Sequence, residues 1–144
     1  MKLYRSKAPL RLGLAGGGTD VAPYSDLYGG AVLNATINKY AYATIIPRTD
    51  DKIILRSLDN GKDLVFDSSD RLEINGELNL LKGIYNRIVQ DYSKEPLSFE
   101  LSTFVDAPPG SGLGTSSTLV VTILGAFAEW LKLPAGPRYA IRNG

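Results

Sequence analysis

The chain has 144 residues, a length that suits one domain or part of a larger one, and its 16 basic and 15 acidic residues leave a formal net charge of +1. It contains no cysteine and no histidine, which excludes disulfides, thiol catalysis, Ser-His-Asp triads, and zinc-thiolate or imidazole metal sites. Any metal must therefore be held by oxygen ligands, which suits Mg²⁺, and the near-neutral charge argues against a broad nucleic-acid-binding surface.

The N-terminal part of the chain predicts β-strands. Residues 10–14 contain three leucines separated by Arg11 and Gly13 and stop at a glycine-rich stretch. Residues 31–46 alternate with a mostly two-residue period, which indicates one long strand or two abutting strands, ended by Pro47. Residues 53–58 and 64–66 lie between turn signals, and we expect them to pair as a hairpin.

The remainder combines helices with one more strand. Apolar residues at spacings of three and four predict a helix over residues 78–92, and alternation predicts a half-exposed strand over residues 97–105. After a loop rich in proline and glycine, residues 119–131 predict a second amphipathic helix with Thr115 or Ser116 as its N-cap. This order of elements makes an α+β chain.

The last eleven positions, residues 134–144, show no periodicity, and we interpret them as an irregular tail. The longest apolar stretch, residues 119–131, is too short to span a bilayer, and no apolar segment of an export signal follows the basic N-terminus. We therefore expect a cytoplasmic protein without a membrane partner.

Side chains outside the glycine-rich segments receive ordinary roles. The acidic residues at 50–51 and 67–70 lie in turn-like contexts, so we interpret them as solvated turns rather than metal clusters. Four aromatic residues lie on strand or helix patterns, and we assign them to the core: Tyr40, Tyr42, Phe99 and Phe127.

The strongest functional signal is residues 108–117, Pro-Pro-Gly-Ser-Gly-Leu-Gly-Thr-Ser-Ser, between a predicted strand and a predicted helix. Closely spaced glycines let the backbone approach a ligand, and a helix start offers unpaired N–H groups and partial positive charge to a phosphate. The segment lacks the lysine of a Walker A loop, and Thr115 stands where the dinucleotide fingerprint needs its third glycine. A Gly-Pro loop before a well-capped helix is the alternative interpretation.

The second signal is residues 8–20, Ala-Pro-Leu-Arg-Leu-Gly-Leu-Ala-Gly-Gly-Gly-Thr-Asp, which predicts a strand feeding a glycine-rich turn. The carboxylate of Asp20 can accept hydrogen bonds from two sugar hydroxyls, and Arg11 is a permanent cation that can face a phosphate. The alternative for Asp20 is an N-cap of the short segment 21–27.

Together the two segments resemble the sequence motifs of the GHMP kinases, the superfamily of galactokinase, homoserine kinase, mevalonate kinase and phosphomevalonate kinase. Galactokinase-type members carry Gly-Glu-His-Thr-Asp in the first motif, whereas Gly17 and Gly18 replace the Glu-His pair here. The Ala-Gly-Gly-Gly-Thr-Asp form is similar to the branch of D-glycero-D-manno-heptose 7-phosphate kinases and fucokinases, and so is the stretch 28–42.

The resemblance covers residues 1–133 and implies an incomplete GHMP kinase N-terminal domain with the α+β fold of ribosomal protein S5 domain 2. It implies ATP, and Mg²⁺ ligated by Ser116. It assigns sugar binding to Arg11, Gly16, Gly17, Gly18, Thr19 and Asp20. It assigns ATP phosphate binding to Pro109, Gly110, Ser111, Gly112, Leu113, Gly114, Thr115, Ser116 and Ser117.

The implied reaction moves the γ-phosphoryl group of ATP to a sugar hydroxyl, with the anomeric hydroxyl of heptose 7-phosphate first and a fucokinase-like reaction second. The family's catalytic Asp lies downstream of these motifs, so no catalytic residue is identified here. We therefore expect a truncated chain that is inactive alone. Apolar surface left where a second lobe would pack favours self-association, including a homodimer.

The alternative from another class is a non-catalytic module that uses the same fold to hold an anion, a nucleotide or a partner. RNA binding is a variant of it, against which the charge of +1 counts. The two classes differ in Asp20 and Ser116, which a kinase needs facing one cleft and a binding module does not.

Overall fold

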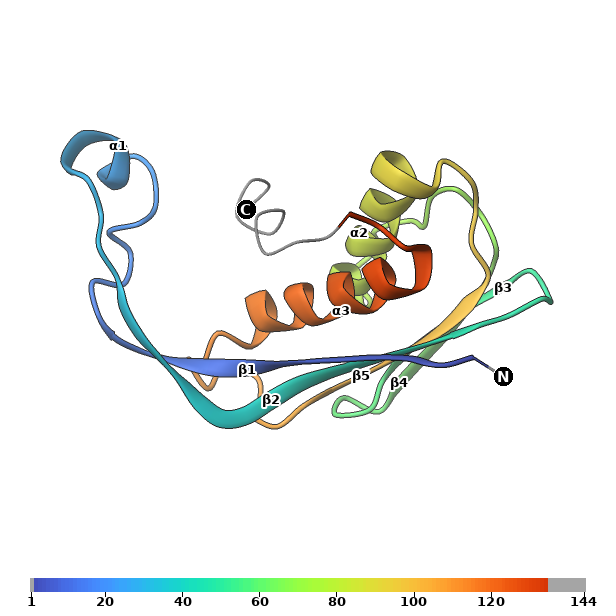
Figure 1. Cartoon of the computed structure of the whole chain (residues 1–144), viewed down its shortest axis with the longest axis horizontal. Coiled ribbons are helices and arrows are strands. Elements are labelled where there is room, and N and C mark those ends of the chain that lie inside the picture. The colour runs from blue at the N-terminus through green and yellow to red at the C-terminus, as the bar shows by residue number, and fades with distance from the viewer. Residues whose placement is uncertain (1, 135–144) are drawn as a thin grey trace.

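The computed structural model describes residues 2–134, which form a five-stranded sheet, two helices packed on one face of it, and a projecting arm (Figure 1). The elements in chain order are β1 (Tyr4–Ala15), α1 (Tyr24–Tyr28), β2 (Leu33–Pro47), β3 (Lys52–Ser57), β4 (Lys62–Asp67), α2 (Asn79–Ile88), η1 (Val89–Ser93), β5 (Phe99–Val105) and α3 (Thr115–Leu131). Within residues 2–134 no helix is long and apolar enough to cross a membrane.

The strand order is β1-β2-β5-β3-β4, so the last strand in residues 2–134 lies in the middle of the sheet. Neighbours are antiparallel except β3 and β5, which are parallel. The connection between two parallel neighbours must cross the sheet, and here β4, α2 and η1 make that crossing. This architecture confirms the predicted α+β class.

The core lies between one face of the sheet and helices α2 and α3. Alternate residues of the central strands point into it, because successive strand residues face opposite sides. The aromatic centre is Phe99, whose ring centroid lies 5.3 Å from that of Phe127, 5.4 Å from Tyr85 and 5.7 Å from Trp130. The core positions predicted for Phe99 and Phe127 are confirmed, since both are fully buried.

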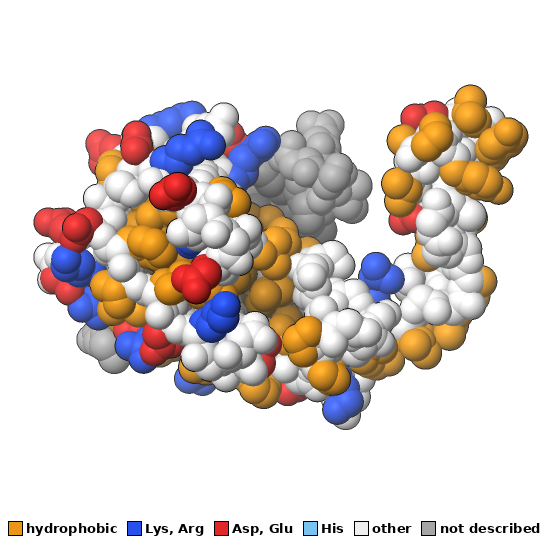
Figure 2. Space-filling model, turned by 180° about the vertical axis from the view of Figure 1, so that it is seen from behind, with side chains coloured by type: hydrophobic (Ala, Val, Ile, Leu, Met, Phe, Trp, Pro, Cys, Tyr) orange, Lys and Arg blue, Asp and Glu red, His pale blue; other side chains and the backbone are white. Residues whose placement is uncertain are grey.

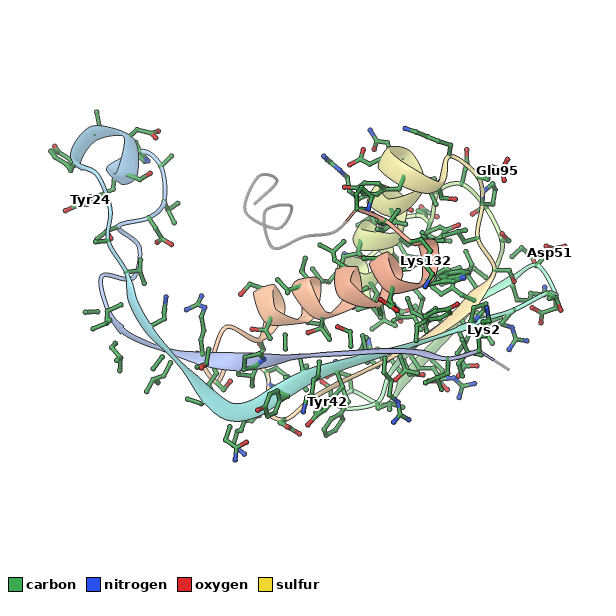
Figure 3. The ribbon with its side chains drawn as sticks, in the orientation of Figure 1. Lys2, Tyr24, Tyr42, Asp51, Glu95 and Lys132 are labelled. Atoms are coloured by element: carbon green, nitrogen blue, oxygen red, sulfur yellow. The ribbon has the colours of Figure 1, made fainter. Side chains whose placement is uncertain are left out.

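The core prediction was wrong for Tyr42. It lies between the buried Ala41 and Ala43 on β2, so its side chain has the opposite parity and points away from the helices (Figure 3). Tyr42 is 37% exposed, and Tyr40, two residues earlier on the same face, is half-buried.

Two helix predictions also need correction. The predicted helix over 78–92 is α2 followed by the single π-helical turn η1. Neither Thr115 nor Ser116 is the N-cap of the last helix, which already begins at Thr115. Its N-cap is Gly114, with φ of 70°, and no side chain caps this end.

The arm comprises the outer ends of β1 and β2 and the connection between them, residues 10–37, with α1 at its tip (Figure 1). Figure 2 shows hydrophobic side chains gathered at this tip. Leu27 and Tyr28 of α1 are 69% and 75% exposed, so the tip carries apolar surface that nothing in residues 2–134 covers. The irregular tail predicted for residues 134–144 lies, beyond Pro134, outside the described residues.

Two connections are held by side chains of α2: the long one before α2 and the short one between η1 and β5. The Tyr85 hydroxyl donates to the Ser69 carbonyl at 2.6 Å and accepts from the Leu97 N–H at 3.1 Å. The Asn86 amide exchanges two hydrogen bonds with the backbone of Leu72. Burial raises the pKa of Tyr85, with a smaller opposing effect from the Leu97 N–H.

We expect Tyr85→Phe to lower the free energy of unfolding by about 1–3 kcal/mol, because the Ser69 carbonyl and the Leu97 N–H lose their partner. The folded state raises the pKa of Tyr85, so its protonated hydroxyl stabilises the fold. This stabilisation is fully present below the pKa of the unfolded chain, about 10, and is lost as pH rises through the pKa of the folded protein. Urea unfolding at pH 7 and above pH 10 measures both effects. Tyr24→Phe on the exposed arm is the control and should change neither.

Candidate functional site

The loop between β5 and α3 contains three glycines in the left-handed region. Gly110, Gly112 and Gly114 have φ of 76°, 74° and 70°. Side chains other than glycine rarely adopt this conformation, so the Gly-x-Gly-x-Gly spacing is a requirement of the backbone path. The alternation turns the chain back on itself and brings it to the start of α3.

Both ends of this loop are tied to neighbouring strands. The Asp106 carboxylate accepts from the Tyr40 N–H at 3.1 Å, and the Asp106 N–H donates to the Tyr40 carbonyl at 3.0 Å. Further along, the Leu113 carbonyl accepts from the Arg11 N–H at 3.1 Å, and the Leu113 side chain packs beside Leu10. These hydrogen bonds therefore fix both ends of the loop to the sheet.

The first turn of α3 presents unsatisfied groups to solvent. The Ser117 hydroxyl donates to the Gly114 carbonyl at 3.1 Å, and the Thr118 N–H donates to the same oxygen at 3.0 Å. Within residues 2–134 the hydroxyls of Thr115 and Ser116 have no hydrogen-bond partner, and Ser116 is exposed. Because helix N–H groups at this end also lack intrahelical partners, the turn is suited to an anion.

A cleft of about 490 Å³ opens beside this loop. Pro109, Thr115 and Ser116 line its loop side. Its other walls come from the β3–β4 turn and the start of α2, namely Ser57, Asp59, Asn60, Lys62, Leu78, Asn79, Leu80 and Leu81, with Val105, Ala107 and Leu119 at its base. The volume lies in the range of small-molecule sites, and polar and apolar residues contribute equally to the lining of this open cleft.

The side chain of Arg11 lies against the loop between β5 and α3. A Cβ added at Gly114 would lie 3.0 Å from Nε and 3.2 Å from Cζ of Arg11. The guanidinium also donates from Nη1 to Oδ1 of Asn34 at 3.2 Å. Within residues 2–134 Arg11 forms no ion pair, so its charge is available at the loop.

The glycine-rich turn of the arm is closed by Thr19. Its hydroxyl lies 2.6 Å from the Gly16 carbonyl and 3.0 Å from the Ala31 carbonyl, and it accepts from the Ala31 N–H at 3.1 Å. A Cβ added at Gly16 would lie 1.9 Å from the Ala31 carbonyl oxygen, and one added at Gly30 would lie 2.0 Å from that of Thr19. These glycines allow two backbone segments to touch, and the Thr19 hydroxyl is used inside the turn.

Asp20 follows this turn and is exposed. It is not an N-cap, because the short helix α1 begins only at Tyr24, and its N-cap position is Pro23. Within residues 2–134 its carboxylate has no hydrogen-bond or ion-pair partner. The arm bends toward the side of the sheet that carries α3 (Figure 1).

The structure thus brings Arg11 together with the loop between β5 and α3 and leaves Asp20 on the arm, out of contact with Ser116. The cleft walls at Asn60 and at residues 78–81 were missed by sequence reasoning. Their local patterns are those of an ordinary turn and an ordinary amphipathic helix. One weak signal was present, since Leu80 lies off the buried stripe of α2 and is partly exposed.

A divalent metal here would take coordinating oxygens from a bound ligand as well as from the protein. In residues 2–134 no cluster of three or more acidic side chains is placed to hold a metal ion. The free hydroxyl of Ser116 is a hard oxygen donor of the kind that Mg²⁺ accepts, beside a loop suited to phosphate. The residues present therefore fit a metal carried mainly by phosphate oxygens.

Comparison with known proteins places these features in a family. Residues 79–143 match the model of the GHMP kinases N terminal domain. The chain is 56% identical over 136 residues to a D-glycero-alpha-D-manno-heptose 7-phosphate kinase of Campylobacter jejuni, covering 94% of this chain and 40% of that protein. It is 30% identical over 149 residues to an L-fucokinase/L-fucose-1-P guanylyltransferase of Bacteroides fragilis, covering 88% of this chain and 16% of that protein.

A solved structure agrees in fold as well as in sequence. The crystal structure of a D-glycero-D-manno-heptose 1-phosphate kinase from Bacteroides thetaiotaomicron superimposes with a TM-score of 0.92 at 57% identity. The superposition covers 98% of this chain and 46% of that one. The chain thus spans less than half the length of either heptose phosphate kinase.

The arm turn gives a prediction that separates adjacent glycines. We expect Gly16→Ala to open the turn, because its Cβ would overlap the Ala31 carbonyl oxygen and φ is 80°. Gly17→Ala is the matched control, since nothing lies within 4 Å of its added Cβ. Hydrogen exchange of the Ala31 amide should accelerate about tenfold or more in the first variant and stay unchanged in the second. Equal exchange in both variants would contradict this account of the turn.

Proposed function

The chain belongs to the GHMP kinase superfamily, whose N-terminal domain it carries, and we propose that it supplies the ATP-phosphate-binding and sugar-binding part of a sugar kinase. The observation that carries the proposal is the loop between β5 and α3, here called the phosphate loop. Its three left-handed glycines lead into the open N-terminus of α3, beside a cleft large enough for a nucleoside.

In this proposal the nucleotide phosphates lie along residues 109–117. Backbone N–H groups at the start of α3 donate to phosphate oxygens, and the partial positive charge of the helix end stabilises them. Ser116 ligates the Mg²⁺ that accompanies the phosphates, while the cleft between the β3–β4 turn and the start of α2 receives the nucleoside.

Arg11 and Asp20 take the remaining roles. The guanidinium of Arg11 lies at the loop, so we assign it to the negative charge of the phosphates, whether on the nucleotide or on a sugar phosphate. The free carboxylate of Asp20 accepts hydrogen bonds from sugar hydroxyls. The reaction forms a bond from a sugar oxygen to the γ-phosphorus and breaks the bond from that phosphorus to the β–γ bridging oxygen, while the proton of the sugar hydroxyl leaves to a base that the two motifs do not supply. Catalysis of this kind depends on positioning and charge neutralisation.

We propose a heptose phosphate as the sugar, because two relatives above 55% identity are described as heptose phosphate kinases. The phosphorylated position differs between their two names, and we choose the anomeric hydroxyl of the 7-phosphate as acceptor. A fucokinase-like reaction is the second choice, on 30% identity.

Calorimetric titration with Mg²⁺-ATP tests the phosphate site directly. We expect saturable binding that Ser116→Ala weakens by about ten- to a hundredfold, through loss of a bond to a charged partner. Gly112→Val should abolish binding, because a β-branched residue at φ of 74° distorts the loop. Ser102→Ala, on the strand face away from the helices, is the control. Binding that neither loop variant weakens would contradict the assignment.

A second prediction concerns turnover. The resemblance places the family's catalytic Asp downstream of the two motifs, and Asp20 is assigned here to binding sugar hydroxyls, so we expect the 144-residue chain to bind Mg²⁺-ATP without transferring phosphate. A coupled assay with heptose 7-phosphate and L-fucose measures this. Turnover near the usual kinase range of about 1–100 per second would overturn the prediction.

A further inference from the structure

The face of the sheet opposite α2 and α3, here called the outer face, is open in the described part of the chain. Figures 1 and 3 show both helices on one side of the sheet and the Tyr42 side chain on the other. The strand pairing defines two rows across this face. One runs Arg5, Thr44, Ser102, Arg56, Asp63, and the other begins Lys7, Tyr42, Phe104.

The middle of the outer face is apolar. The rings of Tyr42 and Phe104 lie with centroids 6.3 Å apart and are 37% and 40% exposed. Leu58 follows directly after β3, and its N–H donates to the Thr103 carbonyl. Val65 faces outward on β4. Both are at least 60% exposed. Aromatic side chains that a fold leaves uncovered in one patch are typical of interaction surfaces.

The two edges of the outer face carry opposite charge. Arg5 and Lys7 lie on the β1 edge, and within residues 2–134 neither has a carboxylate partner. The β4 edge carries Asp63, whose side chain is 57% exposed although it pairs with Arg56 at 3.4 Å. Near the centre, Glu100 lies 3.1 Å from Arg56 and 3.8 Å from Arg48, so that charge is already balanced.

This order of charges is self-complementary. Strand β5 is the middle strand, so a two-fold axis parallel to it places β1 of one chain opposite β4 of the other. Arg5 then faces Asp63 of the second copy in the same row, and Phe104 faces its own equivalent on the axis. An isologous interface requires such a pattern, in which each surface is its own complement.

We propose that two copies of this chain pack their outer faces together as an aligned pair of sheets. Aligned sheets pack with inner faces about 10 Å apart, a spacing that interdigitating Tyr42 and Phe104 side chains can fill. The apolar centre is bordered by charged residues on β1 and β4, so we expect an interface with an apolar centre and a polar rim. This inference is independent of the kinase assignment, whose residues lie on the arm and on the side of the sheet that carries α3.

A single-stranded nucleic acid is the rival occupant, because exposed aromatic rings beside cations can stack bases. The acidic β4 edge on the same face and the net charge of +1 disfavour it, since a strand crossing the face would meet Asp63. In the dimer, the same acidic edge faces Arg5 of the second copy.

Sedimentation equilibrium of the 144-residue chain tests the proposal by charge complementation. We expect Arg5→Glu and Asp63→Arg each to raise the dimer dissociation constant about tenfold or more, because each reversal creates two repulsive contacts per dimer. An equimolar mixture of the two variants should restore dimers, because in the mixed species each of these like-charge contacts is replaced by an opposite-charge pair.

Two variants elsewhere serve as controls. Glu77→Arg reverses a charge away from the outer face, and Leu27→Asp places a charge on the apolar tip of the arm. Both should leave the dimer intact. A monomeric wild type at all concentrations, dimers lost only with Leu27→Asp, or a mixture that fails to restore dimers would each overturn the proposal. Binding of a labelled oligouridine that Phe104→Asp abolishes would assign the face to nucleic acid and overturn it as well.

Discussion

The contact between Arg11 and the loop at Leu113 and Gly114 joins the two glycine-rich segments of the chain. One backbone hydrogen bond holds the Leu113 carbonyl to β1, and a Cβ at residue 114 would lie only 3.0 Å from Nε of Arg11. Glycine suits this position because its φ is 70° and because it leaves room for the Arg11 side chain. The position of the start of α3, and hence of every N–H it offers to an anion, depends on that approach.

The same contact relates the arm to the sheet. Arg11 lies at the base of the arm, and its guanidinium also bonds Asn34 on the second strand of the ribbon. A two-stranded ribbon has little stability alone, so the loop between β5 and α3 supports the arm as the arm positions the loop. The turn that presents Asp20 is closed locally by Thr19, which leaves the carboxylate free.

The two faces of the sheet divide the molecule by chemistry. The inner face is filled by Phe99 and its neighbours from α2 and α3, which fixes both helices and thereby the cleft walls. The outer face carries an apolar centre between edges of opposite charge, and the proposed dimer contact there does not involve the cleft beside the loop between β5 and α3. Strand alternation alone separates these two surfaces, since neighbouring residues on β2 belong to different faces.

Local patterns identified the strands, the helix from its apolar spacing and the glycine-rich loop, because each depends on residues close in sequence. The N-cap at Gly114 was not visible in this way. Serine and threonine are the usual N-caps, whereas here the last left-handed glycine of the loop occupies that position. Likewise Tyr42 lies in an apolar alternating run, and only the position of the helices showed which parity is buried.

By itself the sequence determined the α+β class, the order of elements and the two glycine motifs, since these follow from side-chain periodicity and from backbone conformations that glycine alone adopts readily. The tertiary structure decided the rest. Parallel pairing of β3 with β5 brings the β3–β4 turn at Asn60 beside the loop at Pro109, forming a cleft from segments about fifty residues apart. Only long-range strand pairing sets such proximity, because no local propensity encodes which strands become neighbours.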